Sequence, residues 1–220
     1  MGKFDPVNIG KSYRIGRKRR HRFDPVNQEE KMPLPQVIME YAHDLGYVLV
    51  TALILFSFFA RIVIVNGDSM FRTLAHGDWL LLVNNPVCGE LEQGDVVVAS
   101  LSRFRGGEAI VKRVIATEGQ VVDIDFVAGV VYVDGVALEE PYTNTATNLA
   151  EGMSFPLVVD DGCVFLMGDN RNESMDSRDP EIGQVDIREI LGKAILLVFP
   201  GTGTRDHPMD RDFGRIGGID

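Results

Sequence analysis

The hydrophobic pattern begins with one long apolar run. Residues 45–60 read LGYVLVTALILFSFFA, without a single charge. A bilayer core takes about 20 helical residues. Arg61 can reach the interface from one end of such a helix, and Tyr41 and Ala42 extend the other end. The run also lacks the polar spacing of an amphipathic helix, so we expect a transmembrane anchor over residues 41–61.

Two other interpretations of this run are open. Its short length also suits a buried core helix of a soluble domain. A cleavable signal peptide is the other alternative, but the region before the run is too long for one, and no small-x-small site follows Phe59. An uncleaved anchor therefore fits the sequence best.

After the anchor the pattern changes to short runs of β-branched and aromatic residues, separated by glycine, proline, asparagine and aspartate. Such spacing predicts an all-β domain over residues 62–220. The candidate strands are 62–65, 79–83, 96–99, 109–116, 121–126, 130–133, 164–167 and 194–199. Residues 126–130 carry a glycine between two of these runs and predict a hairpin turn. Residues 139–160 carry few strand signals and predict a loop-rich excursion.

Charge separates the same two parts. The formal net charge is -10, yet residues 1–44 hold nine basic against six acidic side chains, whereas residues 66–220 hold twelve against twenty-six. Seven of the basic residues lie at 11–22, and positive flanks stay in the cytoplasm. We therefore interpret residues 1–40 as a basic cytoplasmic tail, whose positive charge could also bind anionic lipid head groups. The acidic domain would then lie on the extracytoplasmic side of the membrane. So acidic a domain is a poor candidate for nucleic-acid binding.

The two cysteines, Cys88 and Cys163, form no C-x-x-C pair, so the sequence gives no support for a zinc site. An exported domain permits a disulfide between them. Two buried free thiols are the plainer interpretation, because sequence alone cannot place the two residues within bridging range.

Ser69 is a candidate nucleophile because it follows Gly-Asp at the end of the strand-like residues 62–65. On its own it is a weak signal, since serine is common in polar turns. A serine hydroxyl also needs a base. Beyond the anchor, His76 falls in a turn where we expect it to face solvent, and His207 falls in a polar tail. Neither histidine has a persuasive setting.

Lys112 offers an alternative base within the apolar strand 109–116. Because side chains alternate along a strand, either Lys112 or Arg113 must share a face with apolar residues. Burial lowers the pKa of an ammonium group, which a general base working near neutrality requires. The other interpretation is a lysine that extends to solvent. A third segment, residues 167–178, is dense in hydrogen-bonding side chains and could orient a buried base.

Four segments of this chain resemble, in order, those of bacterial type I signal peptidases, the serine–lysine leader peptidases. They are Gly67–Leu74 around the serine, Gly94–Val98, Ile110–Ile115 around the lysine, and Gly168–Arg178. A later Gly192-Lys193-Ala194 is similar to the closing strand of the family. The matches span about residues 62–199, and the apolar run stands where the family has its anchor.

The resemblance implies a role for each matched residue. Ser69 would attack the scissile carbonyl, and a neutral Lys112 would take its proton. Ser174 would orient the lysine amine, Asp176 would support the loop through an ion pair with Arg178, and the backbone N–H of Ser69 would stabilise the oxyanion. The fold implied is a single N-terminal transmembrane helix followed by an all-β signal-peptidase-like catalytic domain, with no metal or organic cofactor.

Two positions depart from the family pattern. Arg72 stands where proline is common; because proline fixes a turn and does no chemistry, we expect altered loop stiffness but retained activity. Gly67 stands where some members have a serine that donates to the oxyanion. The second oxyanion donor therefore stays open, with Gly67 contributing through its backbone or not at all.

The substrate implied is the signal peptide of an exported precursor, cut after a small-x-small motif. An extended substrate could add to an exposed strand edge, for which residues 62–65 are the candidate. Three other readings remain: a relative with a narrower substrate such as a pilus or conjugation precursor, a membrane-tethered β-domain that binds exported chains without cutting them, and a self-cleaving repressor. The anchor and the lack of a basic DNA-binding module count against the last.

Overall fold

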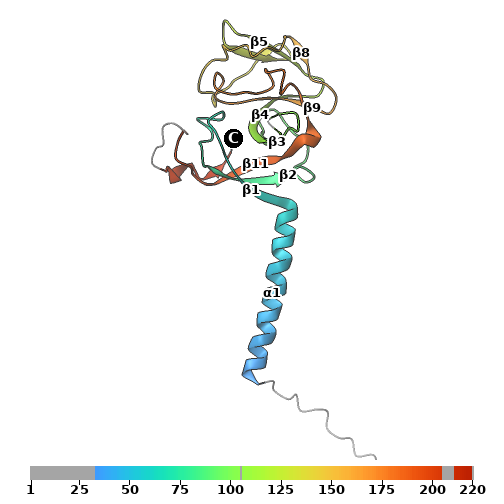
Figure 1. Cartoon of the computed structure of the whole chain (residues 1–220), viewed down its shortest axis with the longest axis vertical. Coiled ribbons are helices and arrows are strands. Elements are labelled where there is room, and N and C mark those ends of the chain that lie inside the picture. Colours follow the sequence, from blue (N-terminus) through green and yellow to red (C-terminus); the bar gives the residue numbers. More distant parts are fainter. Residues whose placement is uncertain (1–32, 105, 205–210, 220) are drawn as a thin grey trace, which may run out of the picture. The chain divides into compact units, whose positions relative to one another are not determined.

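The computed structural model describes residues 33–104, 106–204 and 211–219 (Figure 1). Most of the predicted basic tail and His207 lie outside the described residues. The chain divides into two compact units, residues 1–47 and 48–220. Along the described chain the elements are α1 (Leu34–Phe59), β1 (Ala60–Ile64), β2 (Trp79–Asn84), β3 (Val96–Ser100), β4 (Ala109–Thr117), β5 (Val121–Asp125), β6 (Val130–Val133), β7 (Val136–Ala137), β8 (Leu157–Val158), β9 (Cys163–Met167), β10 (Val185–Asp186), η1 (Ile187–Glu189), β11 (Ile190–Phe199), η2 (Phe213–Arg215) and β12 (Gly217–Gly218).

Helix α1 contains residues 41–59 of the predicted anchor, whose last two residues, Ala60 and Arg61, begin β1 instead. It is long and apolar enough to cross a membrane, and none of its residues is buried. It starts directly after Pro33, whose carbonyl accepts hydrogen bonds from the N–H groups of Gln36 and Val37. The helix begins earlier than residue 41 because residues 34–40 are mostly apolar, and Gln36 and Glu40 among them also favour helical backbone. The limits expected for tail, anchor and domain stay predictions.

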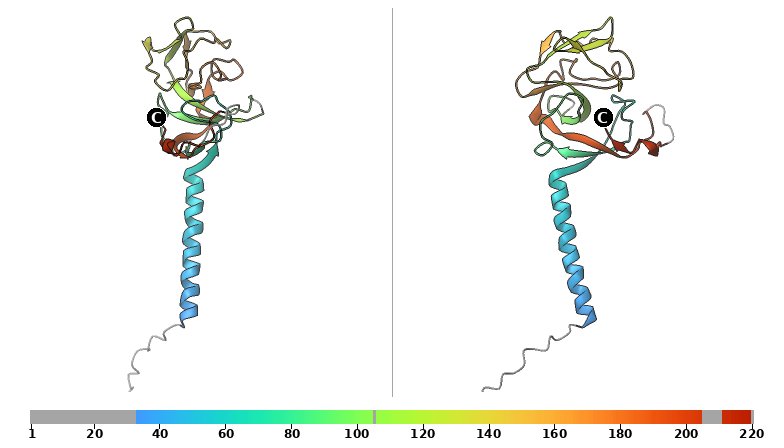
Figure 2. Two further views of the ribbon diagram at one scale, coloured as in Figure 1. Left: turned by 90° about the vertical axis from the view of Figure 1, so that its left-hand side faces the viewer. Right: turned by 180° about the vertical axis from the view of Figure 1, so that it is seen from behind.

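The β-domain consists of two antiparallel sheets, which confirms the predicted mainly β fold. The larger sheet has the order β1-β2-β11-β3-β4-β9-β10, with β12 paired to β11, and the smaller has the order β7-β6-β5-β8. The two sheets occupy opposite ends of the domain, with β5 and β8 at one end and β1, β2 and β11 at the other (Figures 1 and 2). Strand β1 lies at an edge of the larger sheet, as expected for residues 62–65.

The core explains why the strands have these sequences. Three clusters of buried apolar side chains fill the domain, and β4 contributes to two of them. Val114 belongs to one cluster, whereas Ile115 and Ala116 belong to another, and the pairing of β4 with β9 shifts register between Val114 and Ala116. The hairpin predicted at residues 126–130 joins β5 to β6. Residues 139–160 hold only the short strand β8, as their composition predicted.

Cys88 and Cys163 are both free thiols, as the plainer interpretation held, although each is only partly buried. Burial nevertheless raises the pKa of both thiols, which disfavours the reactive thiolate.

Candidate active site

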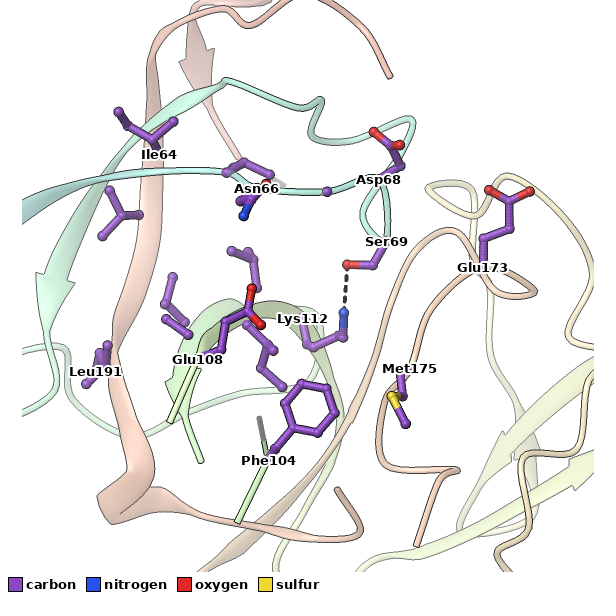
Figure 3. Close-up of a pocket in the computed structure, with 17 residues that line it drawn as sticks. Ile64, Asn66, Asp68, Ser69, Phe104, Glu108, Lys112, Glu173, Met175 and Leu191 are labelled. Atoms are coloured by element: carbon purple, nitrogen blue, oxygen red, sulfur yellow. Dashed lines mark hydrogen bonds between the residues drawn. The ribbon is translucent and has the colours of Figure 1, made fainter. Parts of the chain in front are cut away.

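A cleft of about 330 Å³ opens on the β-domain, and Ser69 and Lys112 face each other across it (Figure 3). One wall is the segment that follows β1, and another is the start of β4. The lining residues are Val63, Ile64, Val65, Asn66, Gly67, Asp68, Ser69, Val98, Phe104, Glu108, Ala109, Ile110, Val111, Lys112, Glu173, Met175 and Leu191. The cleft thus combines an apolar floor with a small polar centre.

Ser69 sits in a turn that its apolar neighbours fix in place. Met70 and Leu74 are both 1% exposed and pack into the core beside β2 and β3. The backbone N–H of Leu74 donates to the carbonyl of Met70 at 2.8 Å. Gly67 precedes the turn with φ +117°, a conformation that favours glycine. The buried methionine and leucine therefore hold the serine at the cleft surface.

Lys112 reaches the serine from β4. Its amine nitrogen lies 2.6 Å from the Ser69 hydroxyl oxygen, and the residue is only 3% exposed. Burial lowers the pKa of Lys112 to about 8, although the carboxylates of Asp176, Glu151 and Asp169 act in the opposite direction. A substantial fraction of the lysine is therefore neutral near physiological pH. A neutral amine at this distance can accept the proton of a serine hydroxyl.

Arg113, the next residue of β4, is buried as well. Its guanidinium forms a bidentate pair with Asp169, with both N–O distances 2.9 Å. The second Asp169 oxygen also accepts a hydrogen bond from the hydroxyl of Thr73, four residues after the nucleophile. The alternation of side chains along the strand predicted that either Lys112 or Arg113 would share a face with apolar residues. Both side chains are buried, because Lys112 lies in the cleft while Arg113 finds a paired carboxylate on the other face.

The loop after β9 provides the support behind the lysine. The Ser174 hydroxyl donates to an Asp176 oxygen at 2.9 Å, and the Gly168 N–H donates to the same oxygen at 2.9 Å. Arg178 forms an ion pair with Asp176 through two nitrogens, each at 2.8 Å. Ser174, Asp176 and Arg178 are all buried. The hydrogen bonds that Asp176 accepts in this cluster hold its carboxylate in one orientation.

The nucleophile turn and this loop are clamped directly together. The backbone N–H of Asn170 donates to the Ser69 carbonyl at 3.0 Å, and its side-chain amide donates to the Asp68 carbonyl at 3.1 Å. Gly168 lies at the crossing point. A Cβ there would stand 2.1 Å from the Ser174 hydroxyl oxygen and 2.5 Å from the Ser69 carbonyl oxygen. Only glycine leaves room for this approach.

Comparison with known proteins places the chain in a family. The family model described as "Signal peptidase, peptidase S26" matches residues 38–199. The chain belongs to this family. It is therefore a serine endopeptidase, as the resemblance implied.

Individual relatives agree. The probable signal peptidase I-1 of Synechocystis sp. is 37% identical, over 80% of this chain and 90% of its own length. Signal peptidase I S of Bacillus subtilis is 31% identical, over 79% of this chain and 95% of its own length. A solved structure of a signal peptidase I from Enterococcus faecalis is 28% identical, covers 47% of this chain and 96% of its own chain, and has a TM-score of 0.39.

Two polar residues of this peptidase have roles that the sequence did not reveal. His76, expected to face solvent, accepts a hydrogen bond at its Nδ1 from the backbone N–H of Gly67 at 3.2 Å. That N–H is therefore occupied in this structure, and the second oxyanion donor stays unassigned. Glu151 contacts Arg178 from the loop between β7 and β8. Neither contact has a local sequence signal: Glu151 meets a residue of another loop, and the His76 contact depends on how the turn after Gly67 folds back.

Proposed function

We propose that this protein is a membrane-anchored signal peptidase that cuts precursor proteins with Ser69 as nucleophile and Lys112 as general base. The observation that carries the proposal is the 2.6 Å distance between the lysine amine and the serine hydroxyl within a buried site. A lysine whose pKa has fallen to about 8 has the basicity that such a role needs.

The reaction follows acyl-transfer chemistry. Lys112 takes the hydroxyl proton as the Ser69 oxygen attacks the scissile carbonyl, and the backbone N–H of Ser69 stabilises the oxyanion. The intermediate collapses when the lysine ammonium gives that proton to the departing amine, which leaves the signal peptide as an ester on Ser69. A water molecule then loses a proton to Lys112 and attacks the ester. The signal peptide leaves with a new carboxylate, and the serine recovers its proton.

Ser174 is proposed to orient the lysine amine. Its hydroxyl hydrogen is donated to Asp176, which leaves the oxygen lone pairs to accept a hydrogen bond from Lys112. Asp176 and Arg178 then act as supports, because their ion pair holds the Ser174 hydroxyl in one orientation. This arrangement would direct the lysine lone pair toward Ser69.

The substrate is proposed to be a signal peptide in extended form, cut after a small-x-small motif. The cleft floor is apolar around Val98, Ile110 and Leu191, which suits small uncharged side chains. Strand β1 lies at a sheet edge and leads directly into the cleft wall, so an extended chain could pair with it. Lipid is the second proposed partner, through α1 as a single-pass anchor, with the N-terminus cytoplasmic and the β-domain extracytoplasmic.

The test is cleavage of a purified secretory precursor in detergent. Ser69→Ala and Lys112→Ala are each expected to abolish cutting at the small-x-small site. Ser154→Ala and Lys193→Ala are matched controls, because Ser154 is exposed and Lys193 pairs with Asp95 outside the cleft. Both controls should cut at the wild-type rate. A wild type that binds precursor but cuts nothing would favour the binding-domain alternative, and full activity in Lys112→Ala would refute the proposed base.

A further inference from the structure

The buried Arg178 guanidinium lies between two carboxylates. Asp176 pairs with it as described above, and a Glu151 carboxylate oxygen lies 3.2 Å from one of the same Arg178 nitrogens. The Arg178 side chain is 0% exposed and that of Glu151 is 11% exposed. The chain from Ser174 to Asp176 to Arg178 therefore continues to a fourth residue, which lies 27 residues away from Arg178 in the sequence.

The surrounding loop is built around this contact. Arg178 donates from its other terminal nitrogen to the carbonyl of Leu149 at 3.1 Å. The backbone N–H of Met153 donates in turn to the Arg178 carbonyl at 3.0 Å. Gly152 packs closely against Pro180, since a Cβ on it would lie 3.2 Å from the proline ring. Residues 149–153 thus form a strap that places Glu151 against the arginine.

Glu151 is the exception to polar pairing in the core. Among the residues that the structure describes, its second carboxylate oxygen is the one buried side-chain atom that accepts no hydrogen bond. A buried carboxylate with an unused oxygen is costly, because desolvation penalises the charge. Arg178 is shared between this carboxylate and that of Asp176. The cost indicates that the Glu151 charge serves a purpose other than stability.

The charges that face Glu151 are Asp176, Arg178 and Asp179. Burial first, and Asp176 second, raise the pKa of Glu151 to about 7, while Arg178 acts against them. Glu151 acts in turn on the base, because after Asp176 it is the carboxylate that most favours the protonated form of Lys112. The two titrations are therefore linked across the ion-pair chain.

We propose that Glu151 is a positioning residue of this peptidase, which holds Arg178 behind the Asp176–Ser174 support and through its negative charge retains the proton on Lys112. The inference rests on the proposed Ser69–Lys112 mechanism. It assigns the strap at residues 149–153 a part in setting the pH range of cleavage. Loss of the Glu151 charge should make Lys112 neutral at lower pH, so that cleavage begins at lower pH.

The experiment measures kcat/KM for precursor cleavage across about pH 5.5 to 9, the range in which such profiles report the ionisations of the free enzyme. In the wild type, activity should rise with the deprotonation of Lys112. In Glu151→Gln the side chain keeps its length and can stay beside Arg178 while the charge is gone. We expect its acid limb to shift to lower pH, with the high-pH plateau changed by no more than about three-fold. Glu181→Gln, the same change at an exposed position nearby, should overlay the wild type.

Glu151→Asp distinguishes the effect of the charge from the effect of side-chain length. It also keeps the proposal testable if Glu151→Gln fails to fold. It keeps the charge but retracts it from Arg178, so the plateau should fall while the acid limb remains close to that of the wild type. A Glu151→Gln profile with an unmoved acid limb, or an acid limb displaced in Glu151→Asp, would overturn the inference. Ser69→Ala is measured in the same assay. Cleavage that persists in this variant would refute the proposed Ser69–Lys112 mechanism rather than the role of Glu151.

Discussion

Gly168 is where the nucleophile turn and the support loop approach most closely, so Gly168→Ala tests whether the catalytic geometry depends on that approach. The added methyl would stand 2.1 Å from the Ser174 hydroxyl oxygen, 2.5 Å from the Ser174 Cβ and 2.5 Å from the Ser69 carbonyl oxygen. Ordinary contacts between such atoms begin at about 3.5 Å. Both serines must therefore move by about 1 Å or more to admit it.

The expected effects on rate and stability differ in size. A displacement of about 1 Å at reacting groups costs on the order of 10²-fold in rate. Overpacking a buried position costs about 1–3 kcal/mol of unfolding free energy, which a domain stable by about 5–15 kcal/mol survives. We therefore expect kcat to fall by about 10²-fold in a protein that remains folded.

Precursor cleavage kinetics and denaturant unfolding are measured on the same preparations. Gly218→Ala is the matched control, since a Cβ there meets no atom within 4 Å, and it should match the wild type in both assays. If Gly168→Ala keeps the wild-type kcat/KM, activity does not depend on the close approach of Ser69 and Ser174. The proposal that Ser174 orients Lys112 would then be wrong.

Two further predictions concern the lysine and the histidine. The pKa of Lys112 is lowered from 10.5 to about 8, so between these values the unfolded chain binds a proton that the folded protein does not, and stability falls as the pH drops from 10.5 to 8. Lys112→Met removes the cost of protonating a buried amine, so the variant should be inactive yet more stable by up to about 3 kcal/mol at neutral pH. The gain should vanish above about pH 10. An equal stability difference at about pH 7 and about pH 10 in denaturant unfolding would contradict this prediction. His76→Ala removes the acceptor of the Gly67 N–H and should lower kcat/KM several-fold and stability by about 1 kcal/mol. His76→Asn, whose amide oxygen can take the place of Nδ1, should recover much of both, and an equal loss in the two variants would show that this hydrogen bond does not hold the turn.

The strands could be predicted because their signal is local. Val130–Val133 was predicted with its observed bounds, and β4 differs from its prediction by one residue, since alternating β-branched side chains directly reflect one buried face. Helix α1 begins at Leu34, before the expected anchor, because Gln36 and Glu40 interrupt the apolar pattern there without interrupting the helix. Local pattern thus predicts elements well and their polar ends less well.

The residues of the candidate site also differ in how far the sequence could reveal them. Ser69, Lys112 and the loop ending at Arg178 could be selected from their motifs, and the fold brings all three together. The strap residue Glu151 could not, because it lies in a stretch with few strand signals and acts through a partner 27 residues away. His76 was misjudged for a related reason: a turn residue is expected in solvent unless the opposite side of the turn presents a donor, and sequence does not show that geometry.

The clamp between Asn170 and the Ser69 turn also bears on how such an enzyme is made. The Asp68 carbonyl and the Asn170 amide that donates to it are 102 residues apart in the sequence. A ribosome therefore adds Ser69 to the chain long before it adds the loop that holds the Ser69 turn in place. A chain synthesised only as far as β4 therefore carries a serine turn without its Asn170 clamp and a lysine without its Asp176 neighbour. The arrangement of the whole site is therefore completed only by one of the last segments of the β-domain to be made.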